Sequence, residues 1–448
     1  MWLLTIALIS FTILWRQVAN ERLRSILMPW AVAVLMMNVT SASFYWGWLH
    51  ALLALTNYAA WIICLDGFAY GTRSNNRVWQ VFILFWGYLM LSSFMGSHPF
   101  QGVATLLNAF ISSFCVGYYI ALWTCKTEGG LRRLNITVTC ASVIIGYLYI
   151  KHGAFASMDK LQETRAVFDA TTFEDKDMVV SVNYTALAMC SVLPFLLVAS
   201  MAISRDRVQK IFKWVALGAM VLCLTVLIKT GARNGGLALL PLGWYLLFST
   251  KNKLKKRSRR FLVIAVVILC AVFAMRIMRG TEGVRALRFF STGGGERGVT
   301  LNEISSGRIQ WWIDEYNSMT PVQVLLGRGF VKESLNERGR AELFNYHSIY
   351  VLVFLHSGLV GIFLMVIALG TFFVVACRKG DRGRMAIMFL SVWALTGVGE
   401  AAGVRGGVTA ILAGFAMGLC SDNPVRNTEL MNDKECKMLY ALPWRGIA

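Results

Sequence analysis

The amino-acid sequence predicts an all-α polytopic membrane protein with about 12 or 13 transmembrane helices and a large extracytoplasmic loop that carries short helices. Of its 448 residues, 56% are hydrophobic and only 15% are charged, and the mean hydropathy is +0.57. A soluble domain carries about 25% charged residues, so this composition excludes a water-soluble enzyme. The apolar residues also gather in stretches close to the roughly 20 residues that a helix needs to cross a bilayer.

These stretches give the expected helices in chain order. They lie at 2–15, 25–40, 44–66, 78–96, 102–125, 134–150, 184–203, 211–228, 234–248, 261–277, 349–376, 383–400 and 407–421. The first is short, and whether it crosses the membrane stays open. It does not resemble a cleavable signal peptide, because no basic residue precedes it and no small-residue cleavage site follows.

The net charge of +20 has a simple explanation in membrane topology. Basic clusters follow the first span and then every second span, as expected for loops that stay in the cytoplasm. They attract anionic lipid and do not require nucleic acid as a partner. The clusters are Arg16/Arg22/Arg24, Arg73/Arg77, Lys126/Arg132/Arg133, Arg205/Arg207/Lys210, 251–260 and Arg378/Lys379/Arg382/Arg384.

This alternation divides the chain into one membrane domain, 1–421, and a cytoplasmic tail, 422–448. It leaves two long polar segments outside, a first extracytoplasmic loop at 151–183 and a large one at 276–346. The large loop holds nine arginines and a single lysine, Lys332. Arginine offers a planar, always charged fork that suits phosphate, so the loop is either a binding surface for an anion or a surface of salt bridges.

Among five histidines, His347 stands out because it lies where the large loop meets the next apolar span. Water on one side and low dielectric on the other can tune an imidazole for proton transfer. The alternative is an interfacial residue in an aromatic belt beside Tyr346 and Tyr350. His356 lies deeper in the same span, where a polar side chain more often makes a hydrogen bond between helices.

Several arginines stand in settings that suit an anionic ligand. Arg233 lies in the short outer turn KTGARNGG, where it either binds a ligand or anchors the interface. Arg308 opens a short amphipathic helix that Ser305 or Ser306 would cap, with Ile309, Trp312 and Tyr316 on its apolar face. Further candidates are Arg328 in the glycine turn GRGF and Arg405 in the outer turn GVRGG.

Other chemistries find no support in the sequence. The HExxH pattern and clustered acidic pairs typical of metal sites are missing, as is the GxSxG turn of serine hydrolases. We therefore expect no metal and no cofactor. The ten cysteines fall in apolar spans, at their edges or in the tail, so neither disulfides nor a zinc site are expected.

The order of these motifs resembles the O-antigen ligase and O-antigen polymerase superfamily of bacterial lipid-linked glycan transferases. The resemblance covers roughly residues 180–400. It rests on VNYTALAMCSVLPFLL at 182–197, GARNGG, SGRIQWW, GRGF, HSIYV and SGLVG. The chain departs from the family pattern at Asn234, where Gly is usual, at Val351, where Leu is usual, and at His356, where Glu is common.

The resemblance implies metal-independent, inverting transfer of a glycan from an undecaprenyl-diphosphate carrier to an acceptor hydroxyl at the outer face of the bacterial inner membrane. It implies His347 as the catalytic base. It implies substrate-binding roles for Arg233, Arg308, Arg328, Arg405 and Tyr350. The expected acceptor is a glycolipid (lipid A-core) or a growing polysaccharide, with membrane lipids as further partners.

Ligase activity is favoured, because the SGR, GxG and HSxY motifs resemble that branch most. A repeat-unit polymerase and a protein O-oligosaccharyltransferase of the same superfamily remain alternatives. A transporter or flippase for lipid-linked sugars is an alternative of another class. It would need ionisable residues near the bilayer midplane, whereas charge here is concentrated in the outer loop.

Overall fold

The computed structural model describes residues 77–126, 130–151, 189–201, 207–230, 233–249, 308–329, 348–399 and 408–421, and these parts of the chain are helical with short turns. The labelled helices are α5 (Arg77–Ser92), η1 (Ser93–Met95), α6 (Pro99–Ala109), η2 (Phe110–Cys115), α7 (Val116–Lys126), α8 (Gly130–Lys151), α11 (Arg207–Thr230), α12 (Arg233–Ser249), α16 (Arg308–Asn317), α17 (Pro321–Leu326), α18 (Ile349–Arg378), α19 (Gly380–Gly399) and α21 (Val408–Cys420). Residues 189–201 form a further helix. No strand occurs in these residues, in agreement with the all-α prediction.

The helix limits follow the hydropathy of the sequence closely. The expected span 349–376 is found as α18, and 383–400 as α19. The expected span 102–125 is a continuous helical segment whose centre, η2, is a π-helix. The expected spans 2–15, 25–40, 44–66 and 261–277 lie outside the described residues, as do the first outer loop and the tail.

Three helical segments in the described parts are long and apolar enough to cross a membrane: Arg77–Met95, Pro99–Leu122 and Ile349–Arg378. Shorter apolar helices cover Met189–Met201, Ile211–Thr225, Leu237–Leu246 and Thr409–Cys420. Large apolar side chains such as Phe363 and Trp214 are more than half exposed on these helices. An exposed apolar face of this kind suits contact with lipid. The protein is therefore an α-helical membrane protein.

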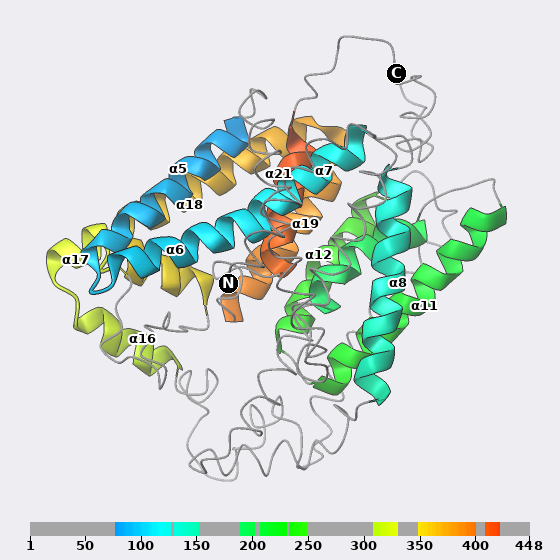
Figure 1. The fold of residues 1–448 in the computed structure, drawn as a ribbon, viewed down its shortest axis with the longest axis horizontal. Coiled ribbons are helices and arrows are strands. Elements are labelled where there is room, and N and C mark those ends of the chain that lie inside the picture. The colour runs from blue at the N-terminus through cyan, green and yellow to red at the C-terminus, as the bar shows by residue number, and fades with distance from the viewer. Residues whose placement is uncertain are drawn as a thin grey trace, which may run out of the picture.

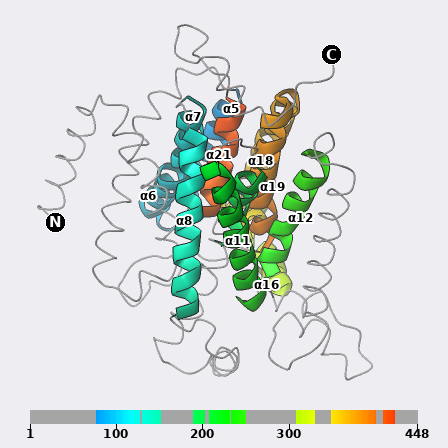
Figure 2. The same cartoon turned by 90° about the vertical axis from the view of Figure 1, so that its right-hand side faces the viewer.

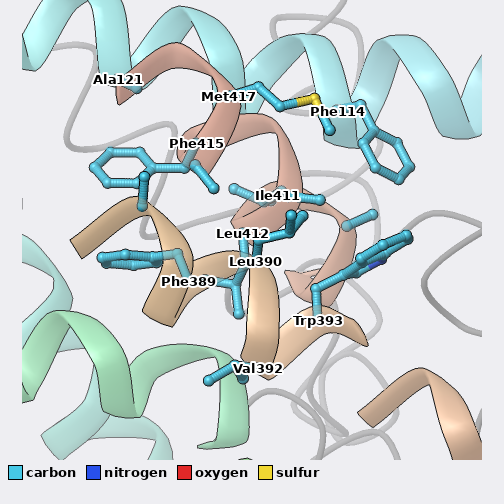
Figure 3. Packing of buried hydrophobic residues seen from close by; sticks show 14 of the residues in the cluster. Phe114, Ala121, Phe389, Leu390, Val392, Trp393, Ile411, Leu412, Phe415 and Met417 are labelled. Carbon is cyan, nitrogen blue, oxygen red and sulfur yellow. The ribbon is translucent and has the colours of Figure 1, made fainter. Parts of the chain in front are cut away.

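The core lies where α7, α19 and α21 meet. Figure 3 shows four aromatic side chains that converge on it: Phe114 from the π-helix η2, Phe389 and Trp393 from α19, and Phe415 from α21. Phe389 and Phe415 have ring centroids 4.9 Å apart, and Phe114 meets Trp393 edge to face at 6.1 Å. Such pairs add to the burial of their large apolar surfaces.

A second group of helices carries the outer-loop residues. Figure 1 shows α5 and α18 running side by side, with α17 at one end of this pair and α16 beyond it. The helices α8, α11 and α12 lie on the other side of the core, and Figure 2 shows α8 beside α11. The described part of the large loop, 308–329, therefore packs against membrane helices and does not project away from them.

Candidate functional site in the outer loop and helix α18

The GRGF motif forms a turn with unusual backbone geometry directly after α17. Thr320 and Gln323 form a capping box that starts this helix, with Pro321 in its first turn. Gly327 ends it with φ 89° and ψ 171°, and Gly329 has φ 67°. The first of these conformations is essentially restricted to glycine. The predicted glycine turn around Arg328 is thus confirmed.

This turn docks into an interruption of α18. Gly358 breaks the helix with φ 64° and ψ −162°, again a conformation for glycine. In an unbroken helix the carbonyls of Leu355 and His356 would accept hydrogen bonds from residues four positions later. Here they accept from the backbone N–H groups of Arg328, at 3.1 Å, and Gly329, at 3.0 Å. The turn thereby satisfies polar groups that hydrocarbon could not satisfy.

The glycines are required by how closely the two backbones approach. A Cβ atom at Gly327 would overlap the carbonyl of His356, and one at Gly358 would overlap the backbone of Leu325 and Gly327. On its other side, a Cβ at Gly329 would lie 2.7 Å from the carbonyl oxygen of Ser92, at the end of α5. The turn is therefore wedged between α18 and α5.

The side chain of His356 joins the interrupted part of α18 to α5 and η1. Its Nε2 lies 3.0 Å from the carbonyl oxygen of Leu89 and 3.2 Å from Oγ of Ser93, and the side chain is buried. The contact to the carbonyl requires an N–H donor at Nε2. The hydroxyl of Tyr88 adds a bond to the carbonyl of Leu326 at 3.3 Å. The expected hydrogen bond between helices is confirmed for His356.

The short helix expected at SGRIQWW is α16, which begins at Arg308. Tyr316 of the predicted apolar face lies over Phe354 of α18, with ring centroids 6.0 Å apart. Trp311, which the prediction left off that face, packs against the core cluster. The residues expected to cap the helix, Ser305 and Ser306, lie outside the described part of the chain.

Arg328 points from the turn to α16. Its guanidinium forms an ion pair with Glu315 and donates from Nη1 to Oγ of Ser318 at 3.2 Å. The two paired side chains are 12% and 24% exposed. These contacts were not predicted, because nothing in the sequence pairs Arg328 with an acid thirteen positions earlier.

The remaining candidates lie at the starts of helices or outside the described residues. Arg233 is the first residue of α12, and Gly235 and Gly236 continue that helix and are not part of the turn. Tyr350 donates from its hydroxyl to the carbonyl of Ala394 at 2.8 Å, which joins α18 to α19. His347 immediately precedes Ser348, the first residue of the described segment around α18, and Arg405 precedes α21; both lie outside the described residues.

A known protein family matches the part of the chain that contains most of the candidate site residues. Residues 218–366 match the family model described as O-antigen ligase. Over these residues the chain is similar to the O-antigen ligase and polymerase superfamily. Among curated proteins the comparison gives no match. The family implies glycosyl transfer of the ligase or polymerase type, with lipid-linked glycans and polysaccharides as substrates in general.

The family region includes α12 and α16, the glycine turn and most of α18. Arg233, Arg308, Arg328, His347 and Tyr350 all fall within it, and Arg405 falls beyond its end. Among the described residues, no group of three or more His, Cys, Asp or Glu side chains has the arrangement of a metal site.

Proposed function

We propose that the protein transfers a glycan from undecaprenyl diphosphate to an acceptor hydroxyl at the outer face of the bacterial inner membrane, as an inverting, metal-independent ligase. The observation that carries this proposal is the O-antigen ligase match over residues 218–366. This range contains His347, Arg233 and Arg308. The expected acceptor is a glycolipid of the lipid A-core type. A growing polysaccharide or a protein hydroxyl would make the same chemistry a polymerase or a protein glycosyltransferase.

In the proposed reaction, His347 accepts the proton of the acceptor hydroxyl as its oxygen attacks the anomeric carbon. The new bond joins that oxygen to C1, and the bond from C1 to the phosphate oxygen breaks on the opposite face, which inverts the configuration. The electron pair of the broken bond leaves with undecaprenyl diphosphate. Arg233 and Arg308 stabilise the charge that develops on this leaving group.

Features of the described helices support these roles. Helix α12 begins at Arg233 and α16 begins at Arg308, and the N-terminal end of a helix favours an anion. His347 is two residues before α18 and Arg405 is three residues before α21. The alternation of basic loops assigns the starts of α12, α18 and α21 to the outer side, which is where a carrier-linked glycan would be met. Arg405 is a further candidate for binding, whereas the hydrogen bond of Tyr350 to the carbonyl of Ala394 favours a role in placing α18.

The decisive experiment measures the length of undecaprenyl-linked glycan in cells that carry His347→Ala. Loss of a general base lowers transfer by about 10²–10⁴-fold, so substrate should accumulate on the carrier. Long, finished polymer on the carrier supports a ligase, whereas single repeat units would show a polymerase and contradict the ligase assignment. His98→Ala is the matched control, since His98 precedes α6 at the outer side without a side-chain capping bond.

If the carrier-linked pool and the surface glycan of His347→Ala cells both equal those of wild type, the proposed enzyme function is wrong. Accumulation of unmodified protein acceptors, with surface polysaccharide intact, would instead favour protein glycosylation. Carrier-linked glycan trapped on the cytoplasmic side would favour a flippase. The control variant should show the wild-type pool in each measurement.

A further inference from the structure

Arg328 connects two parts of the site, one through its backbone and the other through its side chain. Its backbone N–H is bonded to the carbonyl of Leu355 on α18. Its guanidinium is bonded to Glu315 and Ser318, on α16 and just after it. Arg328 thus connects α16, which begins at Arg308, to α18, which begins two residues after His347.

The position of Glu315 on α16 gives this tie a geometric consequence. Glu315 is seven residues after Arg308, which is nearly two full helical turns. Side chains at this spacing lie on the same face of a helix, about 10 Å apart along its axis. An ion pair at Glu315 therefore fixes the rotation of α16 about its axis, and with it the face on which Arg308 lies.

The apolar contacts of α16 with the neighbouring helices leave much of its surface exposed. No residue of α16 is fully buried, and Ile313 and Tyr316 are nearly half exposed. The contacts of Tyr316 with Phe354 and of Trp311 with the core are non-directional and tolerate rotation of the helix. Hydrogen bonds of a guanidinium are directional and resist such rotation.

We propose that Arg328 and Glu315 are positioning residues that hold Arg308 in register with the start of α18, and that Arg328 is not itself a ligand of the diphosphate. This inference rests on the proposed function of Arg308 and His347. It assigns Arg328 a different role from the substrate-binding role that the sequence suggested. It also assigns a role to Glu315, an acidic residue that the charge of the substrate would otherwise disfavour.

The two roles of Arg328 make opposite predictions for Glu315. If Arg328 binds the diphosphate, Glu315 competes for its guanidinium, and Glu315→Ala should leave donor binding unchanged or improve it. If the pair positions α16, Glu315→Ala should reproduce the defect of Arg328→Ala. The double variant should then be no worse than either single one, because both remove the same contact.

The experiment uses the full-length protein in membranes, with undecaprenyl-linked glycan extracted from His347→Ala cells as donor. We expect Arg328→Ala and Glu315→Ala each to lower kcat roughly 10- to 100-fold, as for misplaced groups in other active sites, with little change in donor KM. The exchange Arg328→Glu with Glu315→Arg should recover most of this loss. Asp314→Ala is the matched control, since its exposed carboxylate accepts a bond from Gln310 on the same helix and should leave kcat unchanged.

A rise in donor KM for Arg328→Ala with a normal Glu315→Ala would overturn the inference, as would wild-type kcat in both variants. Where an alanine variant does not accumulate in membranes, Glu315→Gln keeps the size of the side chain and should lower kcat in the same direction. Arg308→Ala separates this inference from the proposed function. If Arg308→Ala is inactive and the pair shows no coupling, only the inference fails; if Arg308→Ala and His347→Ala both transfer normally, the proposed function fails.

Discussion

Glycine brings backbones together in two regions of this protein, and the two regions use it differently. Where α7 crosses α21, a Cβ atom at Gly117 would overlap the carbonyl of Ile411, and one at Gly414 would overlap that of Phe114. Where the GRG turn meets α18, Gly327 and Gly358 approach each other with positive φ values of 89° and 64°. The first region is a crossing of α21 with α7 and the π-helix η2 before it, and the second is an interruption of a single helix.

The difference shows what each contact provides. The crossing contains Gly414 and Gly418 at the small-xxx-small spacing that lets membrane helices pack closely, and large apolar side chains surround it (Figure 3). Close packing of the two backbones stabilises it. The GRG turn instead donates two backbone hydrogen bonds to carbonyls of α18 and directs Arg328 toward α16. The crossing thus stabilises the bundle, whereas the turn fixes positions near the proposed catalytic residues.

The largest effect is expected for Gly327→Ala. A side chain there combines backbone strain of about 1–3 kcal/mol with overlap against the carbonyl of His356, which costs about 1–3 kcal/mol in packed interiors. The variant should lose about 3 kcal/mol of stability and most of its transfer activity. Thermal unfolding of the purified protein in detergent, together with the transfer assay, measures both.

Gly370→Ala is the control for this variant, because Gly370 lies in the same α18 with open space around its Cβ position. Alanine favours a helix over glycine by about 1 kcal/mol, so this variant should be as stable as wild type or more so. Equal stability of Gly327→Ala and Gly370→Ala would contradict the docking of the turn into α18.

The sequence predicted most helix limits because they depend on local properties. The span expected at 349–376 is α18 at Ile349–Arg378, and the turn at 327–329 has the positive φ values that two glycines around Arg328 suggested. Hydropathy, glycine and charge act over a few residues, so one sequence is enough to recognise them.

The partners of these elements depend on distant contacts and could not be predicted. SGLVG was recognised as a motif, but not that its Gly358 interrupts the helix to receive the GRG turn. His356 was expected to bond to another helix, but Leu89 as its partner is 267 positions away. Arg328 was named as a substrate-binding candidate from its glycine turn and the family resemblance, and its ion pair with Glu315 could not be predicted from the sequence. Such pairings follow from the tertiary structure alone.

A smaller effect is expected for Gly117→Ala at the crossing of α7 and α21. Alanine is compatible with the helical backbone there, so only the overlap with Ile411 contributes, at about 1–3 kcal/mol. The unfolding temperature should fall while kcat of the folded fraction stays unchanged, in contrast to Gly327→Ala. Gly218→Ala in α11 has open space and should keep the wild-type unfolding temperature. A loss of kcat in Gly117→Ala would show that the crossing also serves the reaction.

The smallest effect is expected for Tyr350→Phe. This variant tests whether the hydroxyl of Tyr350 only joins two helices or also binds substrate. The phenol group joins α18 to α19 by a single bond to the carbonyl of Ala394, and a bond of this kind contributes about 1 kcal/mol. If the hydroxyl only joins the helices, the variant loses this stability and keeps the KM values of donor and acceptor. If Tyr350 binds substrate, as its position three residues after His347 suggests, a KM rises beyond what the stability loss explains. Phe363→Leu, a change to another apolar side chain on the same helix that is 63% exposed, controls for altered packing. Because the carbonyl of Ala394 already holds the phenol hydroxyl, we expect the first outcome, with Tyr350 acting on the reaction only through the placement of α18.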